Sequence, residues 1–341
     1  MVVTSHHVVA PPLTVLGWLA FVRTDTQRTS TGEISREGSS PREVVMQIPT
    51  VICVGAARST PDIDAVPIDW PLWLGTLALA TAVAFGIWLH GWSVVWPPLS
   101  SAMIALAALL SLGTFYRQTG RSAALARLCL AIAHSLALAY VFQMSTYVVS
   151  ASEVPLRSEA LTRADALLGF SWTAWTAWVH AHPALWTCFQ VVHPLHFAAM
   201  TIAVTVLALT TERGALRLLR AFTFAFIVSA LALALAPALT NTPGALSNTL
   251  RLALRGGTFR VLDFSHTAGL ISFPSMHAAM GVLAGAALWP YRAWRVPVTA
   301  LAIMLCLGAI SEGGHYLVDI LAGAPLGWIA WRLSGRSYAR A

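Results

Sequence analysis

Residues 216–239 read LRLLRAFTFAFIVSALALALAPAL, and no charged residue follows Arg220 in this segment. A helix of about 20 apolar residues crosses the hydrocarbon core of a bilayer, so we expect this segment to be a spanning helix. Seven further apolar runs lie at 71–90, 98–115, 128–150, 185–210, 268–290, 296–311 and 314–333. The sequence therefore predicts an all-α, polytopic membrane helix bundle with about eight spans.

The composition excludes several classes of protein. The 341 residues are 57% hydrophobic and only 10% charged, whereas soluble domains carry about 25% charged residues. This excludes a disordered chain and a soluble enzyme. The net charge of +7 does not indicate a nucleic-acid partner, because the basic residues lie between long apolar runs. We expect membrane lipids as partners instead.

Two domains are expected. Residues 1–65 are predicted to be a disordered or interfacial tail, because residues 23–43 are rich in Ser, Thr, Arg and Glu. The apolar stretches on either side, 8–22 and 44–57, are too short for a confident span. Residues 66–341 form the membrane-embedded domain, which carries all the candidate chemistry.

All 21 basic residues are Arg, and the chain contains no Lys. If the residues before 70 are cytoplasmic, 16 of these Arg fall on the cytoplasmic side, in agreement with the excess of basic residues in cytoplasmic loops. The remaining five occupy two outer loops, at Arg157, Arg163, Arg251, Arg255 and Arg260. These five are candidates for chemistry on the outer side.

The first outer loop is rich in Trp. Trp172, Trp175 and Trp178 recur every three residues, so they lie near one helical face. This pattern is typical of an interfacial helix with an aromatic belt. An aromatic pocket for a lipid tail is the alternative.

Ionisable residues inside membrane segments are costly and mark functional sites. His315 and Asp319 are four residues apart, so they share one face of a helix. A carboxylate that reaches one imidazole nitrogen fixes the tautomer and makes the other nitrogen more basic. The pair can therefore supply a nucleophile or base, although a polar pair that only braces two helices has the same pattern.

A second cluster, FPSMH, lies at 273–277. Pro274 and Ser275 are suited to the start of a helix, where free N–H groups attract an anion such as phosphate. His277 in that first turn could protonate a leaving oxygen. The predicted spans place this cluster and His315 on the same side of the membrane. The spacings Gly281-xxx-Gly285 and Gly323-xxx-Gly327 predict that the two helices pack closely.

FPSMH followed by HYLVDILAG at 315–323 resembles the type 2 phosphatidic acid phosphatase superfamily. It is most similar to the inositolphosphotransferase, or aureobasidin-resistance, branch, which includes inositol phosphorylceramide synthases. The segment DALLGFSW at 165–172 is similar to an upstream motif of that branch. The resemblance covers roughly residues 160–330 and implies a six-helix catalytic core.

The resemblance also implies residue roles. His315 would be the nucleophile that accepts the phosphoryl group, Asp319 would orient it, and His277 would be the general acid. The superfamily also has a Lys and an Arg-Pro in a first motif, and a Ser-Arg pair where this chain has Gly308 and Ala309. These departures fit the phosphotransferase branch better than the simple phosphatases, and they leave the phosphate without an assigned charge partner.

Several residues are candidates for binding the substrate. Arg suits phosphate because its planar fork binds two oxygens at once, which favours Arg255 and Arg260 and, less strongly, Arg251. Loop salt bridges are the alternative role for these Arg. The other candidates are Ser275, His193 and its neighbour His196, and Glu312, a potential base for the acceptor. Helix packing or an interface is an equally plausible role for the two His.

The sequence thus predicts a membrane lipid phosphatase or phosphotransferase that acts through a phosphohistidine. No metal or cofactor is expected, because Arg and a helix end would stabilise the charge, and no pair among the four Cys has metal-ligand spacing. Alternatives are a plain phosphatase for phosphatidate or polyprenyl diphosphate, and a non-catalytic transporter or scaffold. The all-Arg usage predicts a bacterial cytoplasmic membrane, with the site facing the periplasm or exterior.

Overall fold

The structure is a computed structural model that describes residues 66–265 and 267–338. The predicted tail, residues 1–65, lies outside the described residues. The elements are, in order, α2 (Trp70–Leu89), β1 (Ser93–Val94), α3 (Trp96–Thr119), α4 (Ala123–Ser150), α5 (Ser158–Leu167), α6 (Trp172–His180), α7 (Pro183–Val192), the 3-10 helix η2 (His193–Leu195), α8 (His196–Thr210), α9 (Gly214–Leu235), α10 (Leu246–Arg255), β2 (Val261–Leu262), α11 (Met276–Leu288), α12 (Arg292–Ser311) and α13 (Leu317–Tyr338).

Within the described residues, six helices are long and apolar enough to cross a membrane. They are α2, α3, α4, the continuous helix Pro183–Thr210, α9 and α12. The all-α membrane fold is confirmed, but the predicted number of about eight spans is not reproduced. In the run 268–290 only the 13 residues of α11 are helical, about 20 Å of helix, because the chain is extended or turned from Thr267 to Ser275.

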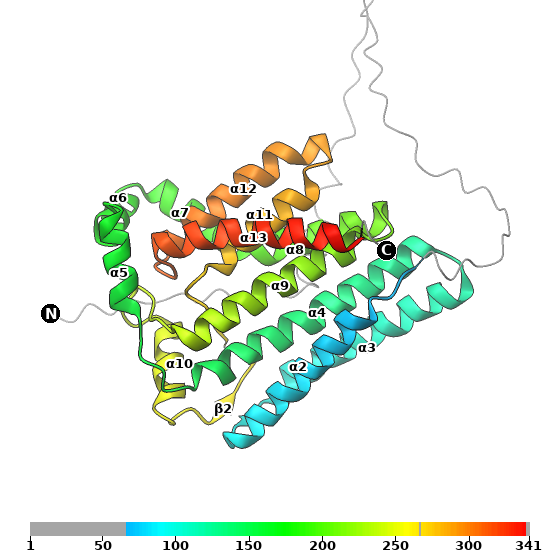
Figure 1. The fold of residues 1–341 in the computed structure, drawn as a ribbon, viewed down its shortest axis with the longest axis horizontal. Helices are drawn as coiled ribbons and strands as arrows, with labels where there is room; N and C mark the ends of the chain where they lie inside the picture. The colour runs from blue at the N-terminus through cyan, green and yellow to red at the C-terminus, as the bar shows by residue number, and fades with distance from the viewer. Residues whose placement is uncertain (1–65, 266, 339–341) are drawn as a thin grey trace, which may run out of the picture. The chain divides into compact units, whose positions relative to one another are not determined.

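Helix α11 lies at the centre of the bundle, in contact with α8, α9, α12 and α13. Helix α4 packs against α8 and α9 on one side and carries α2 and α3 on the other (Figure 1). The core between these helices consists largely of Ala, Leu and Phe. Short helices α5, α6 and α10 gather at one end of the bundle, at the left of Figure 1. We refer to it as the site end, because α8, α11 and α13 begin there.

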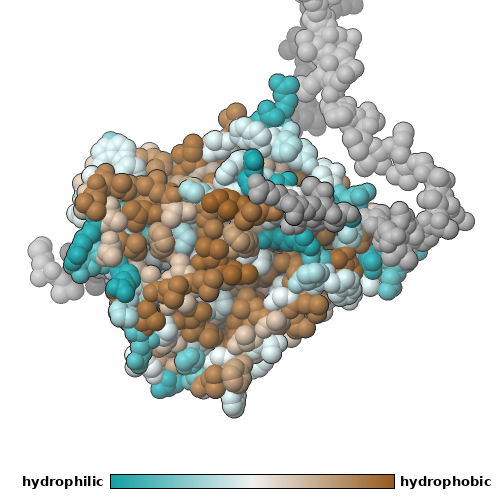
Figure 2. All heavy atoms as spheres, in the orientation of Figure 1, coloured by the Kyte–Doolittle hydropathy of each residue, from teal (hydrophilic) through white to brown (hydrophobic). Residues whose placement is uncertain are grey.

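Large apolar side chains cover the outside of the spanning helices. Trp88, Ile104 and Val296 are 71%, 70% and 78% exposed, and Figure 2 shows apolar residues spread over the visible face of the bundle. Exposed apolar surface on this scale marks contact with lipid or another partner. The surface therefore agrees with the multi-pass membrane protein that the six apolar helices indicate.

Helices α11 and α13 approach each other closely at two glycines. A Cβ added to Gly323 would overlap the backbone carbonyl oxygen of Ser275, and one added to Gly327 would lie 2.5 Å from that of Ala279. The predicted role of this glycine pair is confirmed. The other predicted pair is different, because Gly281 faces Ala302 of α12 and Gly285 faces open space.

Candidate active site

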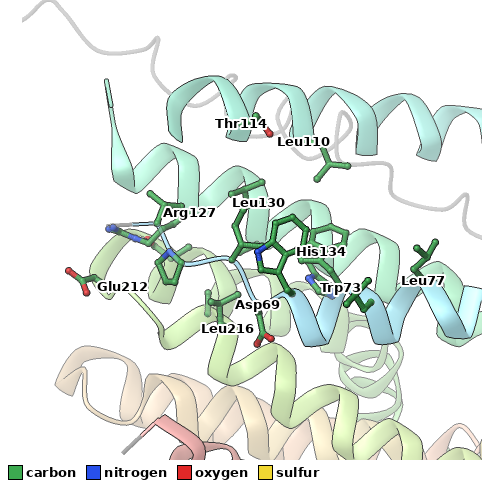
Figure 3. Close-up of a pocket in the computed structure, with 18 residues that line it drawn as sticks. Asp69, Trp73, Leu77, Leu110, Thr114, Arg127, Leu130, His134, Glu212 and Leu216 are labelled. Atoms are coloured by element: carbon green, nitrogen blue, oxygen red, sulfur yellow. The ribbon is translucent and has the colours of Figure 1, made fainter. Parts of the chain in front are cut away.

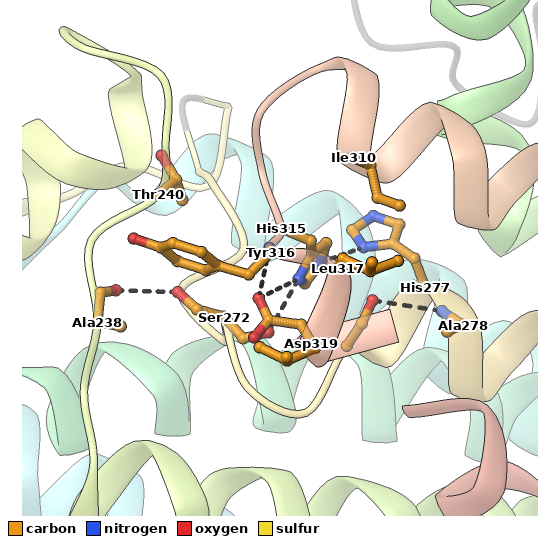
Figure 4. A network of polar contacts seen from close by, with 12 residues as sticks. Ala238, Thr240, Ser272, His277, Ala278, Ile310, His315, Tyr316, Leu317 and Asp319 are labelled. Carbon is orange, nitrogen blue, oxygen red and sulfur yellow. Dashed lines mark hydrogen bonds and ion pairs between the residues drawn. The ribbon is translucent and has the colours of Figure 1, made fainter. Parts of the chain in front are cut away.

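The His315 imidazole is held in one orientation by acceptors on its Nδ1 atom. This atom lies 2.8 Å from the carbonyl oxygen of Ser272 and 3.4 Å from Oδ2 of Asp319. Because a carbonyl oxygen only accepts, Nδ1 carries the proton and donates it. In the neutral ring Nε2 then has a free lone pair. His315 and Asp319 are 2% and 0% exposed, so this tautomer is fixed inside the protein (Figure 4).

His277 faces the reactive nitrogen of His315. Its Nδ1 lies 2.9 Å from Nε2 of His315, and the two rings meet nearly at right angles, at 74°. With Nε2 of His315 as the acceptor, Nδ1 of His277 is the donor. The prediction that the two motifs lie together is therefore met: a proton donor points at the nitrogen that would attack a substrate.

The loop 267–275, which supplies the Ser272 carbonyl, is held by several hydrogen bonds. The Ser272 hydroxyl donates to the carbonyl oxygen of Ala238 at 2.9 Å. Gln143 of α4 donates to the carbonyl oxygen of Ala268 at 2.7 Å, and the buried guanidinium of Arg251 donates to that of Leu270. These bonds anchor the loop to three different parts of the chain, and so fix the acceptor of His315.

Asp165 caps the helix that carries Asp319. Its two carboxylate oxygens accept the N–H groups of Leu317 and Val318 at 3.0 and 2.9 Å, and it is 4% exposed. The negative charge there also complements the positive end of the helix dipole. Asp165 lies in the DALLGFSW motif, and its position shows that this motif orients the first turn of α13.

Two of the outer-loop Trp anchor the turn before His315. Trp172 donates its indole N–H to the carbonyl oxygen of Ile310, and Trp175 donates to the hydroxyl of Ser311, both at 3.0 Å. Trp178 is 49% exposed. Trp172 and Trp175 therefore form neither the predicted aromatic belt nor the alternative lipid-tail pocket. They brace the C-terminal turn of α12.

His193 and His196 complete a group of four imidazoles. Their ring centroids lie 4.6 and 4.3 Å from that of His277. Nδ1 of His196 donates to the carbonyl oxygen of His193 at 2.8 Å, while Nε2 of His193 is buried and has no partner among the described residues. The structure therefore brings both predicted His to the catalytic pair.

The other predicted substrate-binding residues form hydrogen bonds within the protein and do not line the cavity beside His277. Ser275 is fully buried and caps α11, with its hydroxyl oxygen accepting the N–H of Ala278 at 3.4 Å. The helix starts after it, so Pro274 precedes the cap instead of occupying the first turn. Arg255 donates to the carbonyl oxygen of Ser152 and Arg260 to that of Phe259.

A cavity of about 390 Å³ opens beside His277 and His315. Its lining includes the four imidazoles and apolar side chains, among them Phe142, Phe197 and Phe226. None of the described residues that line it is an Arg. A cavity lined by both imidazoles and apolar side chains suits an amphiphilic substrate.

A buried Arg and a half-buried Glu flank this site. Burial, together with the neighbouring charge of Arg255, lowers the pKa of Arg251 to about 10, so its guanidinium stays charged at neutral pH. Burial raises the pKa of Glu312, while His180 opposes that shift. Oε1 of Glu312 is buried without a partner among the described residues. No cluster of three or more His, Cys, Asp or Glu that could hold a metal occurs in the described part of the chain.

The fold and the site together define a polytopic membrane protein with a two-histidine, one-aspartate centre at the starts of two adjacent helices. The sequence model of the PAP2 superfamily matches residues 159–333, just over half of the chain. The chain therefore belongs to the PAP2 superfamily, whose members are usually phosphatases. No curated protein and no solved structure matches the chain.

Proposed function

We propose that the protein is a lipid phosphatase or phosphotransferase that forms a phosphohistidine at Nε2 of His315. The observation that supports this most directly is the tautomer. The Ser272 carbonyl oxygen accepts a hydrogen bond from Nδ1 of His315 and so keeps the proton on that nitrogen. The lone pair of Nε2 is therefore available to attack phosphorus. As that lone pair forms the new bond, Asp319 stabilises the positive charge on the ring.

His277 acts as the acid and then as the base. As the N–P bond forms at His315, the bond from phosphorus to the leaving oxygen breaks, and His277, in its imidazolium form, passes a proton to that oxygen and becomes neutral. In the second step an acceptor hydroxyl attacks phosphorus and the N–P bond breaks. His277 takes the acceptor's proton and is ready for another turnover. The 2.9 Å contact between the two rings means that they separate to admit the phosphorus.

His193 is our first candidate for contact with the phosphate. It lies against Gly308, where a Cβ would be 3.6 Å from the Cβ of His193. Gly308 and Ala309 stand where the superfamily pattern has Ser-Arg, so His193 lies beside the Ser position, one residue before that of the missing Arg. A neutral imidazole can donate one hydrogen bond to a phosphate oxygen. Arg255 and Arg260 stay candidates for the rest of the head group, and Arg251 places a charge behind Leu270 in the cavity wall.

The acceptor decides between hydrolysis and transfer. Water as the acceptor makes the enzyme a phosphatase for a lipid phosphate, and a lipid alcohol makes it a head-group phosphotransferase. The missing Lys and the Gly308–Ala309 pair favour the transferase branch. The distribution of Arg supports a site that faces the exterior of a bacterial cytoplasmic membrane.

Trapping of the phosphoenzyme tests the proposal. Purified protein is incubated with a lipid phosphate labelled with ³²P and then quenched, and we expect an acid-labile, base-stable label. His315→Ala should abolish the label, whereas His180→Ala, at an exposed His on α6, should not. His193→Phe should weaken labelling at low substrate concentration more than at saturation. Full labelling and turnover in His315→Ala would refute the mechanism and favour a transporter or scaffold.

Lipid mass spectrometry identifies the acceptor. The wild-type protein is incubated with candidate phospholipids, with and without ceramide or diacylglycerol. A new phosphorylated lipid that requires the added alcohol indicates transfer, and free phosphate or phospho-head group without it indicates hydrolysis.

A further inference from the structure

A second cavity lies at the end of the bundle opposite the catalytic site. It has a volume of about 400 Å³ and shares no lining residue with the catalytic cavity. The start of α2, the end of α3 and the start of α4 form its walls, with the α8–α9 turn at its mouth. Figure 3 shows Leu110 and Thr114 of α3 on one side and Trp73 and His134 below them. Nothing in the proposed reaction uses this cavity.

The cavity continues along the helices as an apolar groove. A further hollow of about 260 Å³ shares Trp73 and Leu77 with it and extends between α2, α3 and α4 as far as Leu99. From Thr114 to Leu99 the α3 wall is roughly 22 Å long. The hydrocarbon of one leaflet is about 15 Å deep, half of the bilayer core. The groove is therefore long enough for the tail of one lipid.

A buried imidazole with an unused nitrogen lies in the wall of this cavity. His134 lines the cavity and is 1% exposed. Its Nε2 lies 3.1 Å from the hydroxyl oxygen of Thr76, which itself donates to the carbonyl oxygen of Leu72 at 2.8 Å. Thr76 has used its only proton, so Nε2 of His134 must be the donor. In the neutral ring Nδ1 is then an acceptor, and it has no partner among the described residues.

This geometry specifies the ligand. A buried acceptor without a partner costs free energy unless a donor reaches it, and the surrounding walls are apolar. The matching group is therefore a hydroxyl at the head of a hydrocarbon tail. The mouth of the cavity is polar, with Asp69 paired to Arg220 and with Arg127 and Glu212 nearby. The site thus combines charged residues, a buried acceptor and an adjoining apolar groove.

We propose that this cavity binds a lipid alcohol, whose hydroxyl donates to Nδ1 of His134 and whose tail lies in the groove between α2, α3 and α4. Diacylglycerol and ceramide both carry such a hydroxyl and are two sources of the same chemistry. The site is separate from the catalytic histidines, and occupancy does not depend on turnover.

Photolabelling tests the proposal with the full chain in phosphatidylcholine nanodiscs. The probes are a diacylglycerol and a ceramide, each with a diazirine in the acyl chain, and the O-methyl ether of each, which lacks the donor. We expect both alcohols to label α2–α4 peptides and to label them two- to tenfold more than their ethers, which is the range of one net hydrogen bond. Labelling by one alcohol alone identifies that lipid as the ligand. Equal labelling by alcohol and ether in the wild type overturns the proposal without any variant.

Variants locate the bound lipid. His134→Phe keeps a ring against Trp73, whose centroid lies 4.0 Å from that of His134, and should make alcohol and ether label equally. Leu106→Trp fills the groove and should reduce labelling, whereas Ile104→Trp, on the exposed face of the same helix, should not. His315→Ala should label like the wild type, so failure of the proposed reaction leaves this result unaffected. Unchanged labelling in Leu106→Trp would contradict binding in the groove.

Discussion

Asp319→Asn separates two possible roles of the carboxylate, which are to fix the tautomer of His315 and to stabilise positive charge on its ring. One oxygen, Oδ2, accepts both the N–H of Tyr316 at 2.9 Å and the Nδ1 proton of His315 at 3.4 Å. Oδ1 is buried without a partner among the described residues. The amide oxygen of Asn can therefore take the place of Oδ2, with its NH₂ group at the position of Oδ1. The substitution removes the charge and keeps the shape.

The expected loss is moderate because the tautomer does not depend on Asp319. In a Ser-His-Asp triad the same exchange lowers kcat by about 10⁴, since the imidazole adopts the wrong tautomer. Here the Ser272 carbonyl lies closer to Nδ1, at 2.8 Å, and holds the proton by itself. Only the charge-assisted hydrogen bond is lost, at about 1.5–3 kcal/mol. That free energy corresponds to a rate of phosphoenzyme formation about 10- to 150-fold lower.

The assay is the single-turnover rate of ³²P incorporation from a lipid phosphate into purified Asp319→Asn and wild type. Thermal unfolding of both proteins in the same detergent controls for folding. A loss near 10⁴ in a protein that unfolds normally would refute the role of the Ser272 carbonyl. An unchanged rate would instead refute charge stabilisation by Asp319.

Three other substitutions test the packing and the charges around the site. Gly323→Ala pushes α13 against the Ser275 backbone and should lower the free energy of unfolding by about 1–3 kcal/mol. The control Gly285→Ala, in open space, should not lower it. Equal melting temperatures of the two variants would contradict the close approach of α11 and α13. Asp165→Ala removes the cap of α13 and should lower the free energy of unfolding by about 1–2 kcal/mol. It should also lower kcat more than it raises KM. Wild-type stability and wild-type kcat would show that the cap is dispensable. Because burial raises the pKa of Glu312, its folded state keeps the proton to higher pH than the unfolded state, and stability falls as pH rises from the ordinary value of 4.5. Glu312→Gln should therefore raise the melting temperature at pH 7 and have little effect below pH 4.5, and a pH-independent difference would show that Glu312 does not titrate with folding.

The long apolar runs predicted the membrane fold well, because a span needs only length and low charge. The number of spans was less predictable. The run 268–290 is apolar on average, but its first residues form the loop that presents the Ser272 carbonyl, and average hydropathy does not distinguish such a loop from a helix. Helix length depends on where the N-cap lies, and Ser275 sets it for α11.

The motifs identified His277, His315 and Asp319, and the structure brings all three together. The sequence did not reveal the Ser272 carbonyl, since a backbone acceptor leaves no side-chain signal. Asp165 was present in a recognisable motif, but its role depends on the position of α13, 152 residues away in the chain. The outer-loop Arg were candidates for phosphate binding because of their charge. Charge alone does not determine which groups line a cavity, and Arg255 and Arg260 are bonded to backbone carbonyls elsewhere.

Gly308 and Ala309 stand where the superfamily pattern has Ser-Arg, and Gly308 lies against the end of α7. Helix α7 packs against α12 at Gly308, where a Cβ would lie 3.5 Å from the carbonyl oxygen of Phe189, in ordinary van der Waals contact. This packing places His193, at the end of α7, beside His277. Since a Cβ at 308 fits these contacts, Gly308→Ala should leave the His193 imidazole in place. In the proposed mechanism His193 offers phosphate a donor in a site that lacks the fixed Arg, and such a site would bind phosphate more tightly as its imidazoles take up protons.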